Sequence, residues 1–511
     1  MDWRILKNHR FTPNLQPKEP SFRVGYYHRA VTTSGWRLYK LSVVIPRMFL
    51  IVLASFCFQF TYAGAEIKPG EPPLVIVSLD GMDWRVLKNH RFTPNLDFIA
   101  QTGVTADYIK NVVPSSTWPN HHSILTGVYS ENHGIVANRF WDPVYEEMFI
   151  FLFDCSNFDP KFYNNSEPIW LTLQKQGGRS ASYFWPATTS YAEKPTYHAK
   201  ETCLLDCSAI NSKDLPKYRN RTLPGFPPYV HCVFDLRGPW ADRVNNVTHW
   251  LLSDAPPHFV ALYFEEPDTT GHEHGPFSQQ YLDAVENADK NAVGFLLKRL
   301  NESHLLEKVN LIIVSDHGMD STSSSRQVYL DDYIDSSSYF LTEWGPLVHI
   351  WPHPGMKEAI YQNLTKNPIP YIRRVFLKED IPPEYHWKNN RRIPPIFIDP
   401  EVGWFVTRSR NDSPPNLGQH GWPPVESKSY SVFYARGPSF REGAVVEPFK
   451  TVDLYPLMCK LLGIDPRPNN GSLENVEAVL KDPSLSGKVQ FVPLPKLDLI
   501  SLLFAIVFTL A

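Results

Sequence analysis

The chain has 511 residues, of which 43% are hydrophobic and 14% aromatic, and its formal net charge is −3. This composition can bury a large core, which excludes an intrinsically disordered protein. The balanced charge, with no long basic run in the body of the chain, argues against a nucleic-acid scaffold, so we expect no nucleic-acid partner.

The N-terminal segment nearly duplicates a later one. Met1–Gln16 and Met82–Asp97 differ only at Ile5/Val86 and at their last residues. A solenoid unit would recur at a regular period, whereas this copy occurs once. We therefore interpret residues 1–47 as a duplicated exon or a gene-model artefact.

The two ends of the remaining chain carry targeting patterns. Residues 48–65 combine a basic start, an apolar core and small residues, which is typical of a secretory signal peptide. Residues 484–511 end in an apolar run shorter than the roughly 20 residues of a spanning helix. This pattern indicates a GPI-attachment signal or, alternatively, a short membrane anchor. We expect the main folded domain at residues 66–483, located on the extracellular face of the cell and anchored to the membrane.

Acceptor sites and cysteines agree with secretion. Seven asparagines lie in Asn-x-Ser/Thr, namely Asn164, Asn220, Asn246, Asn301, Asn363, Asn411 and Asn470. Cys459 lies among apolar residues at helical spacing, so we expect a buried free thiol. Cys57 belongs to the signal peptide, and the other four cysteines would form two disulfides by one of three pairings: Cys155, Cys203, Cys207 and Cys232.

Three apolar segments each lead into side chains that can bind a metal. The segments read as buried strands, and the residues that follow them are Asp80 after Leu74–Leu79, Asp268 and His272 after Phe259–Phe264, and Asp316 and His317 after Val309–Ser315. One such aspartate alone would be explained as a turn or cap residue. Because ligands of open α/β sheets bind beyond the carboxyl ends of the strands, the threefold repetition predicts a metal site. The glycine-flanked His420 would complete it, whereas His274 is expected to point elsewhere.

A segment rich in small hydroxyl residues, Pro114–Ser123, leads into a helix that we expect to begin at Thr117. Serine and threonine commonly cap helices, so capping alone would explain the segment. Together with the predicted metal residues, it indicates instead that Thr117 is a nucleophile, at a helix N-terminus that favours a phosphate. Asn138 offers an amide donor, with a turn-forming role as the alternative.

Two aromatic segments admit two interpretations each. Residues 139–250 contain a cluster that could be core or could wall a pocket for a stacked base. The basic and aromatic stretch Tyr385–Arg392 could be a nucleic-acid patch, but we expect a solvated loop or insert. Helices are expected at Asn95–Gly103, Gln279–Leu300 and Asp453–Leu462.

Seven motifs in this order resemble the ecto-nucleotide pyrophosphatase/phosphodiesterases of the alkaline-phosphatase-like superfamily. They are VSLDG, PSSTWPNHHSILTG, HGIVAN, YFEEPDTTGHEHGP, SDHGM, GQHG and VDLYPLMCKLLGIDPRPNNGS, and they span about Leu74 to Ser472. The chain is similar to the short members, which lack a Cys-dense module and a nuclease-like domain. The resemblance implies an α/β fold with a central, mostly parallel sheet flanked by helices and a smaller insert or cap region.

The same resemblance implies a site with two Zn²⁺ ions. One ion would be bound by Asp80, Thr117, Asp316 and His317, and the other by Asp268, His272 and His420. Thr117 would attack phosphorus and form a covalent threonyl intermediate, while Asn138 donates to a phosphoryl oxygen. Asn138, Trp118 and Trp185 would contact the substrate. Many relatives have Lys-Thr-Phe at Ser116-Thr117-Trp118, so a positive charge is missing here.

The implied function is an extracellular two-zinc phosphodiesterase or pyrophosphatase that acts on small-molecule nucleotides. Cleavage of choline phosphodiesters or lysophospholipids is the alternative within the same chemistry. A catalytically silent cell-surface binding protein is the alternative outside it. The sequence implies no obligate protein partner.

Overall fold

The computed structural model describes residues 72–89, 92–151, 158–199, 238–424 and 429–481, which belong to one compact unit within Ala65–Ala511. Residues 1–47, the predicted signal peptide and the predicted C-terminal anchor lie outside them, as do Cys155, Cys203, Cys207 and Cys232. Within this described part, no helix is both long enough and apolar enough to cross a membrane. Cys459 is buried and free, which confirms the prediction for this thiol.

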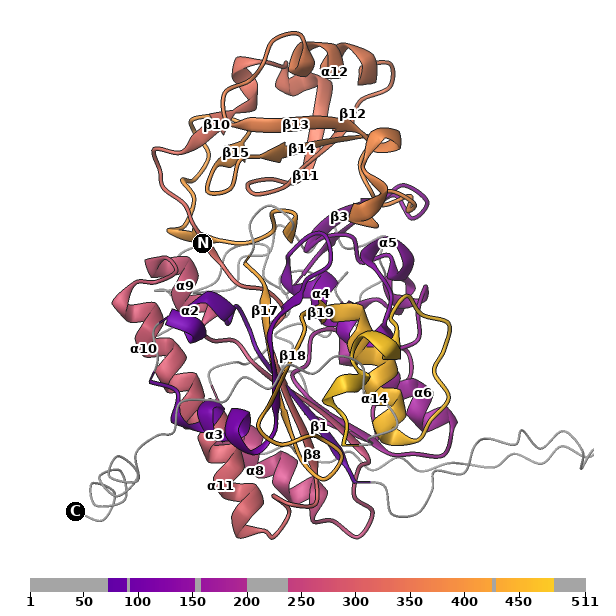
Figure 1. Cartoon of the computed structure of the whole chain (residues 1–511). Coiled ribbons are helices and arrows are strands. Elements are labelled where there is room, and N and C mark those ends of the chain that lie inside the picture. The colour runs from indigo at the N-terminus through magenta and orange to yellow at the C-terminus, as the bar shows by residue number, and fades with distance from the viewer. Residues whose placement is uncertain (1–71, 90–91, 152–157, 200–237, 425–428, 482–511) are drawn as a thin grey trace, which may run out of the picture. The chain divides into compact units, whose positions relative to one another are not determined.

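A nine-stranded sheet lies at the centre of the unit, in the order β18-β2-β17-β8-β1-β7-β5-β6, with β19 beside β2 (Figure 1). The strands are β1 (Leu74–Leu79), β2 (Val104–Lys110), β5 (Ser180–Tyr183), β6 (Tyr197–His198), β7 (Phe259–Phe264), β8 (Asn310–Val314), β17 (Ser431–Arg436), β18 (Ala444–Val446) and β19 (Phe449–Lys450). Among these strands β17 alone pairs antiparallel with both of its neighbours. The sheet confirms the predicted α/β class.

Strand β1 shows why this sheet is buried on both faces. Leu74 and Ile76 pack into one hydrophobic core, whereas Val75, Val77 and Leu79 pack into another. Successive side chains of a strand point to opposite faces, so a continuous apolar run fills both cores. The strand pairs parallel with β7 on one side and β8 on the other, which brings three strand ends to the same edge.

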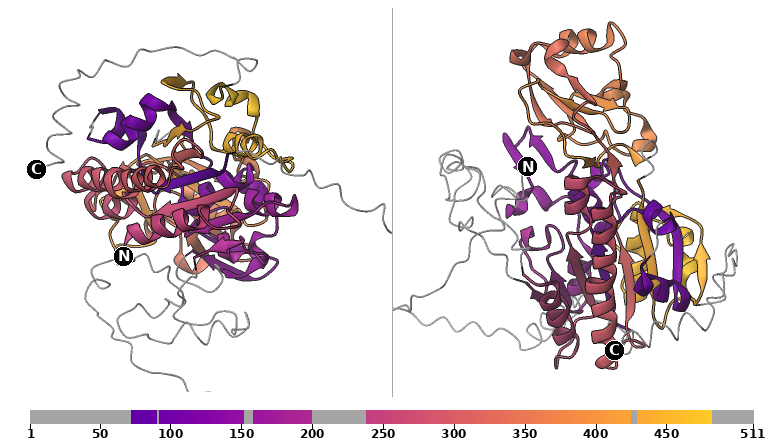
Figure 2. Two further views of the ribbon diagram at one scale, coloured as in Figure 1. Left: turned by 90° about the horizontal axis from the view of Figure 1, so that it is seen from below. Right: turned by 90° about the vertical axis from the view of Figure 1, so that its left-hand side faces the viewer.

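Helices cover the two faces separately (Figures 1 and 2). One core contains residues of α2 (Trp84–Asn89), α3 (Pro94–Thr102), α8 (Trp240–Leu251), α10 (Gln279–Ala288), η7 (Asp289–Gly294) and α11 (Phe295–Glu302). The other contains residues of α4 (Thr117–Thr126), α6 (Ile169–Lys175) and α14 (Leu454–Leu462). The sheet therefore lies between two helical layers, as the resemblance implies.

The predicted insert is a smaller sheet with its own core. Strands β11 (Tyr339–Glu343), β12 (Val348–Pro352), β13 (Ile372–Leu377) and β14 (Ile396–Pro400) form it in the order β11-β12-β14-β13, with α12 (Lys357–Thr365) against one face. Strands β10 (Gln327–Tyr329) and β15 (Phe405–Thr407) pair where the chain enters and leaves the insert. Strand β11 also contacts β3 (Arg139–Asp142), which precedes β4 (Glu147–Ile150).

The helix predicted at Gln279–Leu300 is continuous but not uniform, because the π-helical segment η7 separates α10 from α11. Asp289 in this segment accepts hydrogen bonds of 2.8 Å from Asn95 Nδ2 and from the Leu96 backbone N–H. The carboxylate therefore satisfies amide groups at the start of α3, a tertiary contact that no periodicity reveals.

The stretch Tyr385–Arg392 lies in the insert, as predicted, but it is not a solvated loop. Trp387 and Arg392 are fully buried. Trp387 Nε1 donates to the Val136 carbonyl at 2.9 Å, and Arg392 Nε donates to Asp142 Oδ2 at 2.7 Å. Arg392 and Asp142 are 250 positions apart, so the basic and aromatic composition of the stretch could not show these buried contacts.

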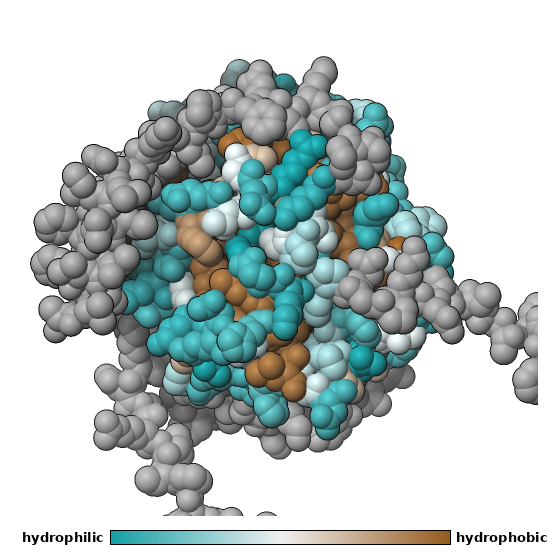
Figure 3. Space-filling model, turned by 60° about the horizontal axis from the view of Figure 1, so that its bottom comes forward, coloured by the Kyte–Doolittle hydropathy of each residue, from teal (hydrophilic) through white to brown (hydrophobic). Residues whose placement is uncertain are grey.

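The surface carries exposed acceptor sites. Six of the predicted glycosylation asparagines lie in the described part of the chain and are exposed, namely Asn164, Asn246, Asn301, Asn363, Asn411 and Asn470. Where Figure 3 shows described residues, hydrophilic side chains surround separate hydrophobic patches.

Candidate metal and nucleophile site

Three strand ends bring carboxylates to one edge of the sheet. Asp80 directly follows β1, Asp316 follows β8, and Asp268 begins the short helix α9 (Asp268–His274) after β7. The backbone N–H of Asp268 donates to the Asp80 carbonyl at 3.0 Å, so the segments that follow β1 and β7 are joined directly. The parallel pairing of β1 with its two neighbours therefore places these predicted residues together.

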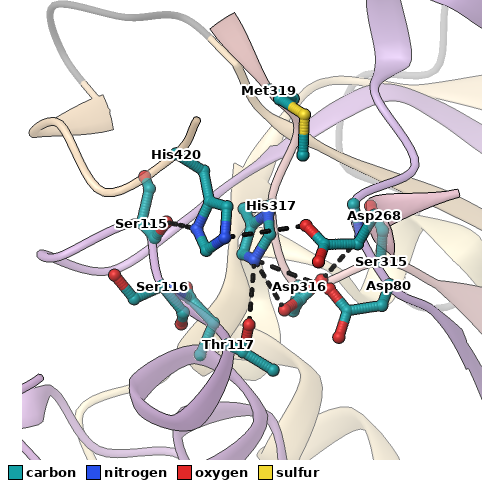
Figure 4. A network of polar contacts seen from close by, with 12 residues as sticks. Asp80, Ser115, Ser116, Thr117, Asp268, Ser315, Asp316, His317, Met319 and His420 are labelled. Atoms are coloured by element: carbon teal, nitrogen blue, oxygen red, sulfur yellow. Dashed lines mark hydrogen bonds and ion pairs between the residues drawn. The ribbon is translucent and has the colours of Figure 1, made fainter. Parts of the chain in front are cut away.

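Asp80, Asp316 and His317 form a buried group (Figure 4). His317 Nε2 lies 3.0 Å from Asp316 Oδ2 and 3.6 Å from Asp80 Oδ1. The same nitrogen lies 3.3 Å from Thr117 Oγ1. His317 Nδ1 donates to the Gly318 carbonyl at 3.0 Å, because a carbonyl only accepts, and this bond turns Nε2 toward the group.

A second group contains Asp268, His272 and His420. Asp268 oxygens lie 3.4 Å from His272 Nε2 and 3.6 Å from His420 Nε2. Each imidazole donates from Nδ1 to a backbone carbonyl, at 2.8 Å to Gly418 and at 2.9 Å to Ser115. These bonds leave both Nε2 lone pairs facing the carboxylate, which is the usual arrangement of a metal-binding histidine.

The two groups form one site. The rings of His317 and His420 stack with centroids 3.6 Å apart at 14°. All seven side chains predicted to bind metal are therefore brought together from five separate segments: Asp80, Thr117, Asp268, His272, Asp316, His317 and His420. His274 lies outside both groups and faces Glu273 at 3.7 Å on the surface.

The electrostatics of the site fit a divalent cation. Asp80 Oδ1, Asp268 Oδ1 and Asp316 Oδ2 are buried and have no hydrogen-bond partner among the described residues. Burial, followed by the charges of the other two carboxylates, raises the pKa of Asp80 well above its usual range. Burial also raises the pKa of Asp268. Crowded, unpartnered carboxylates are costly unless a cation compensates them, and carboxylate oxygens with imidazole nitrogens suit Zn²⁺.

Helix α4 begins at Thr117, as predicted, but serine does not cap it. The Ser116 side chain makes no capping bond within the described structure. Asn120 instead accepts from the Val112 backbone N–H at 2.9 Å and donates from Nδ2 to the Pro114 and Ser116 carbonyls, each at 2.9 Å. An asparagine inside the helix thus holds the preceding loop, which fixes where Thr117 stands.

The predicted substrate-contact residues lie beside this helix. Asn138 Oδ1 accepts a 3.0 Å hydrogen bond from the Trp118 backbone N–H. The Trp118 indole is 2% exposed and donates to Tyr163 OH at 3.2 Å, and Trp185 is 1% exposed and donates to the His121 carbonyl at 3.4 Å. Both indoles belong to the main core, so substrate contact by these two residues stays a prediction.

Two supporting residues escaped the sequence analysis. Tyr263 OH, from β7, donates to Asp80 Oδ2 at 2.5 Å. His121 Nδ1 donates to the Thr117 carbonyl at 2.8 Å and lies 3.5 Å from Asp316 Oδ2, while its Nε2 faces Ser78 Oγ at 2.9 Å. Tyr263 is a hydroxyl-bearing residue in an otherwise apolar buried strand. This feature of the sequence could have indicated a polar contact at the site.

Arg85 joins the loops after β1 and β8. Its Nε donates to Asp83 Oδ1 at 2.9 Å, and its terminal nitrogens donate to Asp320 Oδ1 at 3.0 Å and to the Met319 carbonyl at 2.7 Å. Asp320 in turn belongs to β9 (Asp320–Ser321), which pairs with β16 (Gly418–Gln419) just before His420. One side chain therefore ties together the loops that carry most of the site.

Comparison with known proteins identifies the family of the chain. The family model described as type I phosphodiesterase / nucleotide pyrophosphatase matches residues 74–423. The chain is 35% identical over 438 residues to bis(5'-adenosyl)-triphosphatase ENPP4 of Homo sapiens, covering 85% of this chain and 88% of the relative. It is 34% identical over 445 residues to ectonucleotide pyrophosphatase/phosphodiesterase family member 7 of Mus musculus, covering 86% and 93%.

Solved structures give the same result. Murine ectonucleotide pyrophosphatase/phosphodiesterase 5, an inactive variant in complex with AMP, is 31% identical with a TM-score of 0.70, covering 80% of this chain and 100% of that chain. The human protein of the same description is 33% identical with a TM-score of 0.71.

Proposed function

Because the chain belongs to the type I phosphodiesterase / nucleotide pyrophosphatase family, we propose that it is an extracellular, zinc-dependent enzyme that hydrolyses phosphodiester or pyrophosphate bonds of small nucleotides. One observation carries this proposal: the Thr117 hydroxyl stands 3.3 Å from His317 Nε2, at the junction of two carboxylate–imidazole groups. The AMP complex of a structural relative supports a nucleotide as the substrate.

The proposed ion-binding sets follow the two groups. Asp80, Thr117, Asp316 and His317 would bind one Zn²⁺, and Asp268, His272 and His420 would bind the other. When bound, the ions would supply positive charge that favours the alkoxide of Thr117 and stabilises the phosphoryl oxygens.

Thr117 is the proposed nucleophile. Its Oγ1 attacks phosphorus, the bond from phosphorus to the leaving oxygen breaks, and the nucleotidyl group remains covalently on Thr117. Water then cleaves the bond between Thr117 and phosphorus and releases a nucleoside monophosphate. Since Asn138 Oδ1 is already bonded to the Trp118 N–H, its Nδ2 is the donor left for a non-bridging phosphoryl oxygen. We further propose that Trp118 and Trp185 contact the substrate only through their small exposed edges.

The test compares zinc-loaded wild type with Thr117→Ala, Thr117→Ser and the control Thr126→Ala at the other end of α4. We expect Thr117→Ala to lower hydrolysis of diadenosine triphosphate by about a thousandfold or more, Thr117→Ser to retain part of it, and the control to keep it. Chelation should abolish hydrolysis and added zinc should restore it.

Other results would support the alternatives. Faster hydrolysis of a phosphocholine ester than of any nucleotide by the wild type would favour the choline phosphodiesterase. If the folded, zinc-loaded wild type hydrolysed no diester at all, the silent binding protein would be the better description.

We also propose that residues 48–65 are removed as a signal peptide and that residues 484–511 direct lipid anchoring of the catalytic domain, residues 66–483. The six exposed acceptor asparagines support passage through the secretory pathway. Release of activity from intact cells by a phosphatidylinositol-specific phospholipase tests the anchor, and activity that stays on the cells would favour a short retained membrane segment.

A further inference from the structure

An exposed tryptophan stands out in the insert. Trp344 directly follows β11 and is 39% exposed. The guanidinium carbon of Arg139 lies 3.5 Å from the centre of its ring. Arg139 is itself fixed, because its Nε and its backbone N–H each donate to Glu343 at 3.1 Å. The guanidinium therefore covers one face of the indole, and the exposed surface belongs to the opposite face and the edges.

The chain on either side of this pair leads to the proposed site. Arg139 directly follows Asn138, whose Oδ1 bonds to the backbone next to Thr117. Pro346, two residues after Trp344, lies beside Gly421: a Cβ atom at Gly421 would be 3.4 Å from Pro346 Cβ and 3.4 Å from Ser116 Oγ. The chain that carries the pair thus runs beside the loop of the nucleophile, through Asn138, and beside the loop of His420, through Pro346.

We propose that Trp344, backed by Arg139, is the stacking platform for the base of the leaving-group nucleotide, and that this residue gives the site its preference for substrates with a second base, such as dinucleoside polyphosphates. This inference rests on the proposed phosphodiesterase function of the same site. Attack by Thr117 divides such a substrate into a nucleotidyl half, which stays on the threonine, and a leaving half that carries a second base. An aromatic face accepts any nucleobase, so the platform favours a second base without selecting its identity.

The same geometry argues against a choline headgroup at this position. An indole attracts a cation through its ring face, but here one face already holds a guanidinium. A quaternary ammonium on the other face would add a second positive group to the same ring. A neutral base stacks there without that conflict.

Binding is measured on zinc-loaded Thr117→Ala protein, in which substrate is not turned over, by calorimetric titration with diadenosine triphosphate and with ATP. Both ligands carry the same nucleotidyl half, but only the first has a base in its leaving half. Trp344→Ala is expected to lower the affinity for diadenosine triphosphate about tenfold and to change the affinity for ATP by less than about twofold. Trp344→Phe should keep most of the affinity.

The control is Tyr371→Ala, which removes another exposed aromatic side chain of the insert, 46% exposed and stacked on Trp404 at 3.4 Å. This substitution should leave the affinity for both ligands unchanged. The proposed platform would be wrong if Trp344→Ala lowered the affinity for both ligands equally or for neither. It would also be wrong if Trp344→Ala lowered only the affinity for a phosphocholine ester.

The two proposals fail separately. If wild type hydrolyses diadenosine triphosphate and Trp344→Ala leaves its KM unchanged, the platform is wrong and the enzyme assignment stands. If no diester is hydrolysed but Trp344→Ala still selectively weakens diadenosine triphosphate, the platform stands as a binding site and the proposed catalysis is wrong.

Discussion

Replacing Tyr263 with phenylalanine removes a single oxygen from the support of the proposed metal site. That oxygen donates a 2.5 Å hydrogen bond to Asp80 Oδ2 in a region where Asp80 is only 2% exposed. The ring packs edge-on against His121 with centroids 5.4 Å apart, and phenylalanine can keep that contact. The substitution therefore tests the hydrogen bond and not the packing.

The expected size of the effect follows from the charge and burial of the acceptor. A hydrogen bond to a charged group contributes about 1.5–3 kcal/mol, and losing the partner of a metal-binding carboxylate commonly lowers metal affinity by about 10–100-fold. Asp80 Oδ1 has no hydrogen-bond partner among the described residues. The hydrogen bond from the Tyr263 hydroxyl to Oδ2 therefore orients the Asp80 carboxylate. We expect zinc affinity to fall by about 10–100-fold and activity to recover in excess zinc.

The assay is competition for zinc with a chromogenic chelator, followed by activity at limiting and at saturating zinc. Tyr339→Phe is the matched control, because its buried hydroxyl has no hydrogen-bond partner within the described residues. Equal zinc affinity in Tyr263→Phe and wild type, or an activity loss that saturating zinc does not rescue, would refute the argument.

Three other outcomes are expected away from the metal. Burial lowers the pKa of His349 to about 3, so the unfolded chain binds more protons below pH 6.5 and stability falls from pH 6.5 towards 3. In urea unfolding at pH 5 and 7, His349→Leu should reduce the loss of unfolding free energy between the two pH values by up to about 1.4 kcal/mol per pH unit. The same substitution at the exposed His353 is the control and should not reduce it. Asp142→Asn leaves the buried Arg392 without its carboxylate and should cost about 3–5 kcal/mol in thermal or urea unfolding, and near-wild-type stability would contradict this. Burial raises the pKa of Cys459 to about 12, so iodoacetamide should label it only after unfolding; rapid labelling of the native protein would contradict its burial.

The sheet and the metal-type residues could be predicted because both depend on short segments. A strand buried on two faces reads as a continuous apolar run. Strands β1 and β7 occupy the predicted Leu74–Leu79 and Phe259–Phe264, and β8 is one residue shorter at each end than the predicted Val309–Ser315. Parallel pairing then brings the residues after the strands together without further information from the sequence. That is why Asp80, Asp268 and Asp316 meet as expected.

The rest depends on contacts between distant segments. Tyr263 and Asp80 are 183 positions apart, and Arg139 and Glu343 are 204 apart. Local sequence shows Tyr263 only as a hydroxyl-bearing residue in an apolar strand, and it does not identify the distant partner of Tyr263 or of Arg139. The burial of Trp387 was missed for the same reason, since its carbonyl partner lies 251 positions away.

The imidazoles of the site are oriented by main-chain carbonyls, at Ser115 for His420 and at Gly318 for His317. A main-chain carbonyl is kept in every amino-acid replacement, so side-chain substitution does not remove either interaction. Ser115→Ala would keep the carbonyl that orients His420, whereas any side chain at Gly318 would collide with Asp83, because a Cβ there would overlap Asp83 Oδ2. Tolerance of substitution at Ser115 is thus no sign that the site can do without this residue, because its contribution comes from the course of the backbone.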